Sequence, residues 1–147
     1  MRPVYASNTH IPELNAQTGA FVSQLCFGRP DQIERYCSMA VFHGEQLVAG
    51  TLYHNWQPDS GVIELTSAST DRRWLTKPVV RAMFHMAFGM IGAQLVALRV
   101  SERNAGMVAI AQRFGFQGTL IPRLRGRDEA EWLFTLTDDD WRASRWS

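Results

Sequence analysis

The spacing of apolar residues divides the chain into segments that have the periods of strands and helices. Residues 3–7 form a short apolar run that predicts a first strand. Residues 11–27 carry apolar side chains at the loose three- and four-residue spacing of a helix. A second short helix is predicted over residues 30–37, because a proline is well tolerated in the first turn of a helix.

The strand pattern is clearer from residue 39 onward. Residues 39–55 contain two strand-like runs separated by Gly44, Glu45 and Gln46, which is typical of a β-hairpin. Residues 61–70 form a third run rich in β-branched side chains and follow a turn-forming segment. We therefore expect a meander of three antiparallel strands.

The second half of the chain alternates between helical and strand patterns. Apolar residues recur at intervals of three and four over residues 79–88, just after Pro78, whose missing N–H is not needed at a helix start. Residues 93–101 are an almost continuous apolar run, which predicts a central strand buried on both faces. A helix over residues 104–116 and a last strand over residues 130–137 follow. This order indicates an α/β (α+β) domain with a mixed sheet.

Composition limits the class of protein. The 147 residues suit a single domain, with 46% hydrophobic and 20% charged residues, the balance of a soluble globular protein. No run approaches the roughly 20 apolar residues that a membrane helix needs. The first ten residues contain no apolar core of a secretory signal, so we expect a cytoplasmic protein with no membrane partner.

Cysteine spacing and net charge exclude other classes. Cys26 and Cys37 are too few for a disulfide scaffold, and their apolar surroundings predict buried thiols. No spacing of cysteine and histidine suggests a metal site. The net charge of +1 gives no overall attraction to nucleic acid. Two local clusters of arginine are expected to be a solvated loop and tail: Arg123, Arg125, Arg127, Arg142 and Arg145.

A resemblance to a known family appears at residues 103–119, RNAGMVAIAQRFGFQGT, where an asparagine begins a helix that ends in Gly-Phe. With the order of elements above, this motif resembles the GNAT superfamily of acyl-CoA-dependent N-acyltransferases. Residues 132–141, WLFTLTDDDW, are most similar to the branch that acetylates ribosomal-protein and other N-termini. The resemblance covers residues 38–141. It implies the GNAT fold, a mixed and mostly antiparallel sheet of six to seven strands flanked by about four helices.

The resemblance also implies an activity, the transfer of an acetyl group from acetyl-CoA to a primary amine of a small molecule, peptide or protein. In the family, glycines in a loop after the third meander strand bring backbone N–H groups close to the cofactor pyrophosphate. The three corresponding positions here are Leu75, Pro78 and Val80. Pro78 removes one donor, and we expect Val80 to place a branched side chain where the phosphate would lie.

Polar residues near this loop are the candidates that replace the glycines. The resemblance places the pantetheine arm along the end of the third meander strand, and it places an asparagine against the cofactor. Asn104 is equally suited to cap the following helix. The candidate acyl-CoA-binding residues are Ser67, Ala68, Ser69, Arg72, Arg73, Thr76, Lys77 and Asn104.

Two titratable residues are candidate bases. Glu64 falls on a family position that acts on the amine, and its place in an apolar strand predicts desolvation that would raise its pKa. The alternative is that Glu64 faces solvent. His54 ends the preceding strand, is expected to lie near Glu64 and titrates in the useful range, although it could equally pack in a loop cluster.

The proton donor for the leaving thiolate is the least defined part of the predicted site. The family's usual tyrosine falls on Ala111, and the serine that replaces it in the ribosomal-protein branch falls on Met107. Neither side chain can donate a proton. Tyr53 or Ser101 could take the role, or the thiolate could leave unassisted.

Two further functions stay open at this stage. A GNAT-fold enzyme that modifies adenine in nucleic acid, as some phage members do, would explain the altered loop and the arginines beside Trp74 and Leu124. A non-catalytic binding or assembly module would explain the missing glycines and acid. An exposed sheet edge and the tryptophans near the C-terminus also make a homodimer an expectation. Acidic residues around the last strand, Glu129, Glu131 and Asp138 to Asp140, are expected to form a solvated face.

Overall fold

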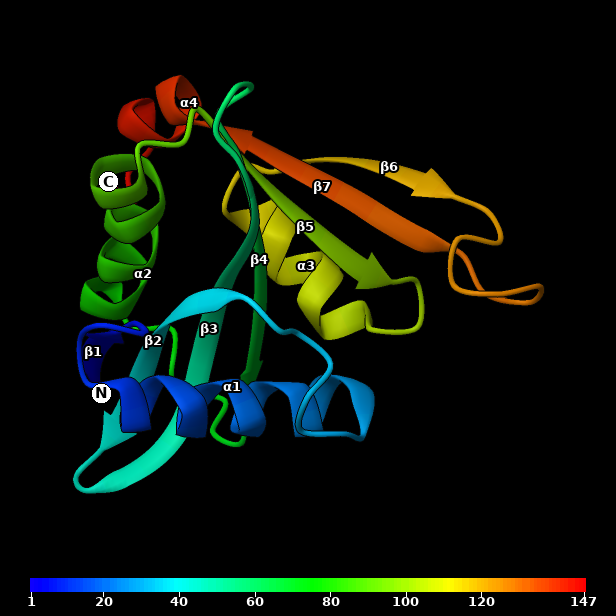
Figure 1. The fold of residues 1–147 in the computed structure, drawn as a ribbon. Coiled ribbons are helices and arrows are strands. Elements are labelled where there is room, and N and C mark those ends of the chain that lie inside the picture. Colours follow the sequence, from blue (N-terminus) through cyan, green and yellow to red (C-terminus); the bar gives the residue numbers. More distant parts are fainter.

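The computed structural model describes all residues 1–147 and contains one seven-stranded sheet with helices on both faces (Figure 1). The strand order is β1-β2-β3-β4-β5-β7-β6, and β4 and β5 are the only parallel neighbours. The mixed, mostly antiparallel sheet confirms the predicted fold class. The strands are β1 (Arg2–Ala6), β2 (Tyr36–His43), β3 (Gln46–Gln57), β4 (Val62–Ser69), β5 (Leu95–Ser101), β6 (Gln117–Ile121) and β7 (Glu131–Thr137).

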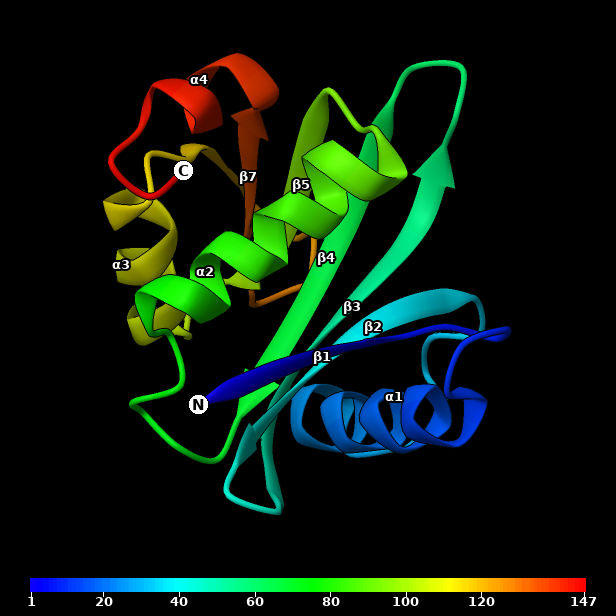
Figure 2. The same ribbon diagram turned by 90° about the vertical axis from the view of Figure 1, so that its left-hand side faces the viewer.

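The helices are divided unequally between the two faces (Figure 2). One face of β2, β3 and β4 is covered by α1 (Pro12–Phe27). The other face is covered by α2 (Lys77–Phe84), its continuation as the π-helix η1 (His85–Ile91), α3 (Ala105–Arg113) and α4 (Asp138–Ala143). The structure thus has one face with a single helix and one with three helical segments and a π-helical turn.

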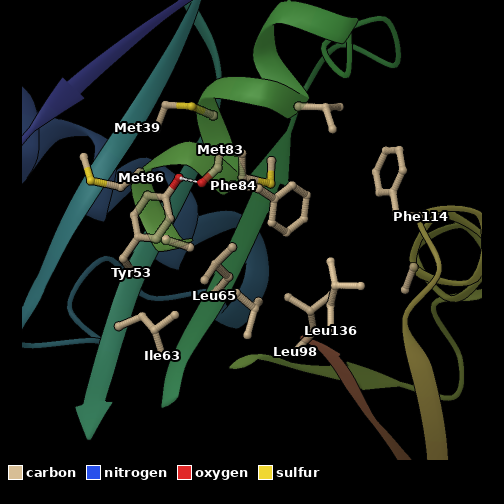
Figure 3. Packing of buried hydrophobic residues seen from close by; sticks show 14 of the residues in the cluster. Met39, Tyr53, Ile63, Leu65, Met83, Phe84, Met86, Leu98, Phe114 and Leu136 are labelled. Atoms are coloured by element: carbon tan, nitrogen blue, oxygen red, sulfur yellow. Dashed lines mark hydrogen bonds between the residues drawn. The ribbon is translucent and has the colours of Figure 1, made fainter. Parts of the chain in front are cut away.

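The main hydrophobic core lies under α2, on the face with several helices (Figure 3). Strand residues such as Ile63 and Leu65 point from β4 toward Phe84, whose ring meets four other aromatic rings. Tyr53 is buried there too, and its hydroxyl donates a hydrogen bond of 2.7 Å to the carbonyl oxygen of Met83. This cluster accounts for the periodic apolar signal that predicted the strands and α2.

The buried face of α1 is not the apolar one that the sequence predicted. Its buried residues are Asn15, Thr18, Gly19, Val22 and Ser23, whereas Leu25 and Cys26 are exposed. The cause is close approach: a side chain at Gly19 would collide with the Tyr36 ring, and one at Gly50 of β3 would lie 2.6 Å from Thr18. Small residues on both elements allow the helix to lie directly on the sheet.

Two predicted segments differ in the structure. No helix forms over residues 30–37, because β2 begins at Tyr36 and pairs with β3, which leaves residues 32–35 as irregular backbone. The run over residues 93–101 forms β5, but the strand is not buried on both faces, since the side chain of Arg99 is 47% exposed. One face of β5 packs on the core, and the other faces an opening.

Two short elements were not predicted. β6 is an edge strand that pairs only with β7, and four of its five residues are exposed, so it carries no apolar alternation. α4 begins after Thr137, whose hydroxyl caps the helix by accepting a hydrogen bond from the N–H of Asp140. Its Trp141 is buried against Phe84. The acidic segment Asp138–Asp140 is therefore the first turn of a helix.

Candidate functional site

The parallel strands β4 and β5 separate halfway along their length. They pair only through Val62, Ile63 and Glu64 of β4, and Glu64 lies opposite Ala97 of β5. Beyond this point β4 continues to Ser69 and β5 to Ser101 without pairing, and Figure 1 shows the two strands diverging. The backbone groups that would have joined the strands are left facing the gap. The separation creates an opening within the sheet itself.

A cleft of about 1080 Å³ occupies this opening on the α1 face. The edge of β4 from Glu64 to Ser69 forms one wall, and β5 from Leu98 to Ser101 forms the opposite wall. The third side is formed by the end of α1 and residues 32–35, so the segment predicted to be a helix contributes to the cleft instead. Exposed Cys26 also lies here, which corrects the prediction of a buried thiol.

His54 and Glu64 lie side by side at the apex of the cleft, as the sequence predicted. They are directly opposite each other in the β3–β4 register, and His54 Nε2 is 3.8 Å from Glu64 Oε2. The same Nε2 is hydrogen-bonded to Thr66 Oγ1 at 2.8 Å. Their side chains are 12% and 19% exposed, so neither points freely into solvent. Burial lowers the pKa of His54 below its ordinary value, against a smaller opposing effect of the Glu64 charge.

The lowered pKa determines the charge of this pair at neutral pH. A histidine whose pKa lies below 6.5 is mainly neutral at pH 7, so its imidazole can accept a proton. Glu64 supplies a negative charge beside it, which suits a cationic ammonium group. A neutral imidazole next to a carboxylate is a competent arrangement for general-base chemistry.

Ser101 and Asn104 also line the cleft, at the end of β5. The Ser101 hydroxyl donates a hydrogen bond to Glu129 Oε2 and accepts one from the backbone N–H of Arg103. Asn104 Oδ1 accepts a hydrogen bond of 3.2 Å from the N–H of Met107, which confirms its predicted role as the cap of α3. Both side chains face the opening while they hold the turn after β5.

Ser67, Ala68 and Ser69 form the far part of the β4 wall. Ser67 Oγ is hydrogen-bonded to Thr51 Oγ1 at 2.8 Å, and Ser69 Oγ donates to the carbonyl oxygen of Asp71 at 2.7 Å. The side-chain hydroxyls therefore already have partners within the protein. Backbone groups on the unpaired edge are the part of this wall that remains available to a ligand.

The four predicted residues of the following loop do not line the cleft. Arg73 is held by Asp71 through an ion pair of 2.9 Å, and the hydrogen bonds from Arg73 lower the Asp71 pKa to about 2. Arg72 and Lys77 are exposed and have no ion-pair partner. Thr76 Oγ1 is buried and has no hydrogen-bond partner.

The structure corrects the expected obstruction of this loop. Val80 is fully buried in the main core, so its branched side chain packs inward and does not cover the exposed start of α2. Pro78 does remove one donor and the N–H of Val79 is buried with the rest of that residue, but the backbone N–H of the exposed Lys77 donates to no internal partner. The helix start keeps part of its capacity to donate hydrogen bonds to an anion.

Tyr53 is excluded as a proton donor in the cleft. Its ring lies in the main core on the opposite face, as Figure 3 shows, and burial raises its pKa well above 10. Its hydroxyl is committed to the carbonyl of Met83. Of the two hydroxyl groups considered from the sequence, only that of Ser101 reaches the cleft.

Five charged residues of the cleft were not predicted: Glu34 and Arg35 on the third side, and a group of three, Arg99, Arg125 and Glu131. Glu131 is 2% exposed, and its two oxygens accept from different arginines. Arg99 binds Oε2 through Nε at 2.9 Å and Nη2 at 2.8 Å, and Arg125 binds Oε1 through Nε at 3.0 Å. The expectation of a solvated acidic face is wrong for Glu131, whereas Arg125 lies in an exposed loop as predicted but is paired with Glu131. We call these three residues the Arg–Glu–Arg cluster.

The sequence carried little signal for this cluster. Arg99 is a single charge in an apolar run, Glu131 begins the last strand, and Arg125 lies in the loop between β6 and β7. They meet because β7 inserts between β5 and β6, which places Glu131 opposite Ser101. The strand alternation that exposes Arg99 is the one feature from which its position could have been found.

No group of three or more histidine, cysteine or acidic residues is arranged to hold a metal ion. None of the helices combines the length and the apolar character needed to cross a membrane.

Solved structures of acetyltransferases resemble this chain. Its fold matches that of the spermidine/spermine N-acetyltransferase SpeG from Vibrio cholerae with a TM-score of 0.74 over 97% of this chain and 98% of that one, at 7% identity. The structure of yncA from Salmonella typhimurium, described as a putative acetyltransferase and solved with acetyl-CoA, matches with a TM-score of 0.68 at 12% identity, over 92% of each chain.

A third match has higher identity. A structure described as a probable acetyltransferase of the GNAT family from Chromobacterium violaceum is 25% identical over 73% of this chain and 61% of that chain, with a TM-score of 0.61. The chain spans less than two thirds of the length of this structure and of three other acetyltransferase structures that it matches. No protein-family model and no curated protein sequence matches the chain. The structural neighbours show that the chain has the fold of GNAT-family acetyltransferases.

Proposed function

We propose that this protein is an acyl-CoA-dependent N-acyltransferase that transfers an acetyl group from acetyl-CoA to a primary amine. The observation that carries the proposal is the separation of β4 from β5 directly beside His54 and Glu64. A cleft with unpaired backbone on both walls and a base at its apex suits an extended thioester and an amine that meet there. The fold shared with acetyltransferases supports this assignment.

The donor would lie along the β4 wall. Alternate backbone groups along this segment of β4 face the gap and can hydrogen-bond the amide groups of a pantetheine arm. Asn104 and Ser101 face this wall from the end of β5. When bound, acetyl-CoA supplies an activated acyl group as a thioester.

The phosphate groups of the donor would lie at the start of α2. The free N–H group of Lys77 and the positive end of the helix dipole favour an anion there. The unpartnered Thr76 hydroxyl lacks an acceptor, which a phosphate oxygen would supply. Arg72 and Lys77 add unpaired positive charge, whereas Arg73 is engaged with Asp71. These residues fit a pyrophosphate without the usual glycines.

His54 and Glu64 would prepare the acceptor amine. Glu64 attracts the ammonium group, and the neutral His54 accepts the proton that must leave before nitrogen can attack the thioester. Thr66 fixes the imidazole through its hydrogen bond to Nε2. Tyr53 lies in the core and the Ser101 hydroxyl already donates its proton to Glu129, so the thiolate would leave unassisted.

The acceptor is less defined than the reaction. SpeG acts on spermidine and spermine, but on the opposite wall here the only carboxylate is Glu131, which is buried and bound by two arginines, so this wall offers no free carboxylate to a second ammonium group of a polyamine. The similarity of residues 132–141 to the branch that acetylates protein N-termini keeps a peptide amine among the candidates.

Two measurements test the proposal. Calorimetric titration with acetyl-CoA and free CoA should show micromolar binding, and thiol release from acetyl-CoA should depend on an added primary amine. Lys77→Ala should weaken CoA binding about tenfold, roughly 1.4 kcal/mol. Arg81→Ala removes the same charge one turn further along α2 and should have a smaller effect.

Absence of binding by both acetyl-CoA and CoA would overturn the proposal. Binding without amine-dependent thiol release from any of a panel of amino acids, peptides and diamines would also contradict it, and would leave a module that binds CoA without transferring an acyl group.

A further inference from the structure

The guanidinium groups of the Arg–Glu–Arg cluster have hydrogen-bond donors to spare. An arginine side chain carries five N–H donors. Arg99 uses Nε and Nη2 to bind Glu131, and Arg125 uses only Nε. Neither side chain makes any other hydrogen bond within the protein. The side chains are 47% and 32% exposed, and both line the cleft.

Glu131 holds the two arginines in place without cancelling their charge. It is almost fully buried and each of its oxygens is occupied, so it has little capacity to bind a further cation. Two guanidinium groups and one carboxylate leave one net positive charge at this wall. A buried carboxylate that fixes arginine side chains reduces the entropy lost when they bind an anion.

A purely structural role explains only part of this geometry. A salt bridge that merely joined the β6–β7 loop to the sheet would need only one arginine paired with Glu131. The remaining N–H donors of that arginine would be best left in bulk solvent. Here two arginines from different elements converge on the same cleft. Arg103, which pairs with Glu129 on the same loop at 3.1 Å, shows the contrasting case, because it does not line the cleft.

The cluster lies within reach of a molecule held at His54 and Glu64. Glu64 is opposite Ala97, and Arg99 is two residues further along the same face of β5, roughly 7 Å along the strand. The Glu64 charge is one of the interactions that raise the Arg99 pKa, after the larger effect of Glu131. A small molecule can therefore contact both groups at once.

The third side of the cleft carries large apolar groups beside polar ones, since Gln32, Glu34 and Arg35 line it as well. The side chains of Leu25 and Phe27, at the end of α1, are 49% and 40% exposed and border the opening, together with half-buried Ile33. Large apolar residues exposed around a cleft indicate a surface for an apolar group of a ligand.

We propose that the acceptor is an α-amino acid with an apolar side chain, whose amine lies at His54 and Glu64 and whose carboxylate is bound by Arg99 and Arg125. This inference rests on the proposed function and deepens it by naming the acceptor class. Arginine pairs bind carboxylates with geometry that an ammonium or amide group cannot reproduce. The arginine end of the site would thus select acceptors that carry a carboxylate, and the end at His54 and Glu64 would select those with an amine that can lose a proton.

A binding experiment tests the carboxylate site without the acyl donor. The probes are N-acetyl-L-leucine and N-acetyl-L-phenylalanine, each compared with its own amide by titration calorimetry at fixed ionic strength. The acids should bind at least tenfold more tightly than the amides. Arg99→Gln and Arg125→Gln should each remove this preference, and Arg103→Gln should retain it.

Equal affinity for acid and amide, or no binding of either acid, would overturn the inference. If Arg103→Gln also lost the preference for the acid, the preference would come from overall charge rather than from the cluster, and the inference would be overturned. If one arginine variant fails to fold, the acid–amide comparison in the unaltered protein still decides the question.

The kinetic counterpart separates this inference from the proposed function. L-leucine should be acetylated with a higher kcat/KM than L-leucinamide, and Arg125→Gln should raise KM for leucine much more than it lowers kcat. Amine-dependent transfer with no preference for the carboxylate would refute the acceptor class and leave the transferase intact. Binding of the N-acetyl acids without any transfer would refute the transferase and the acceptor class with it, and would leave only a carboxylate-binding site at the two arginines.

Discussion

The two faces of the sheet are built from different chemistry. Under α2, large aromatic and aliphatic side chains fill a continuous core, in which Phe84 contacts Phe88, Phe114, Phe116 and Trp141. On the α1 face the contacts are small or polar, and the remainder is an open cleft lined by charged groups. Stability is concentrated on one face and the candidate chemistry on the other, so substitutions on the two faces should have separable effects.

The largest expected effect is on the core. Phe84→Ala should lower the free energy of unfolding by about 3–5 kcal/mol, because it removes a fully buried ring and leaves a cavity. Leu25→Ala, on the cleft side, should change it by less than about 0.5 kcal/mol, since Leu25 is 49% exposed. Urea denaturation of both variants measures the contrast, and similar losses would show that the two faces share the stabilisation.

His54→Gln should have the opposite profile, with a large effect on activity. Loss of a general base should lower kcat/KM about 100-fold, roughly 2.7 kcal/mol, at neutral pH. The pKa of His54 is lowered, so the imidazole is neutral above that value and protonated below it. Protonation of His54 disables the base in the unaltered protein. The fold difference in kcat/KM between the unaltered protein and the variant, the deficit of the variant, should therefore narrow as pH falls below 6.5.

The ratio of the two kcat/KM values gives this deficit at each pH, because ionisation of the acceptor amine cancels. The absence of any deficit at neutral pH would assign the proton transfer to Glu64 instead. His43→Gln, at the exposed hairpin end of β2, is the matched control and should behave like the unaltered protein.

A smaller effect is expected where α1 meets the sheet. Gly19→Ala should lower the free energy of unfolding by about 1–3 kcal/mol, because the added methyl group collides with the Tyr36 ring. The control is Gly28→Ala at the end of the same helix, where nothing lies within 4 Å but φ is +73° and the cost is backbone strain alone. Combining Gly19→Ala with Tyr36→Ala should recover part of the loss, and failure to recover any would show that close approach is not the cause.

The same contrast explains how much the sequence could predict. Strands with large apolar side chains, the hairpin of β2 and β3, and the cap at Asn104 follow from local patterns, and these fixed the fold class correctly. The buried face of α1 could not be predicted, because glycine, threonine and asparagine at a close contact give no apolar period. The edge strand β6 was missed for a related reason, since it buries almost nothing.

The candidate site was predictable where neighbours in the meander determine it. His54 and Glu64 meet because two adjacent strands place them in register. The Arg–Glu–Arg cluster depends on β7 lying between β5 and β6, an arrangement that brings Glu131 to Arg99 across 32 positions and that no local pattern encodes. Long-range sheet order, rather than residue type, is what the sequence did not reveal.

The separation of β4 from β5 also has a consequence for hydrogen exchange. From Leu65 to Ser69, β4 keeps β3 as its only strand partner. Along such an edge alternate backbone amides point toward the partner and away from it, so every second amide proton in this segment should exchange with solvent quickly although the strand lies in the middle of the sheet. A ligand that hydrogen-bonds this edge would slow those protons selectively and so restore the protection that the missing strand pairing does not provide.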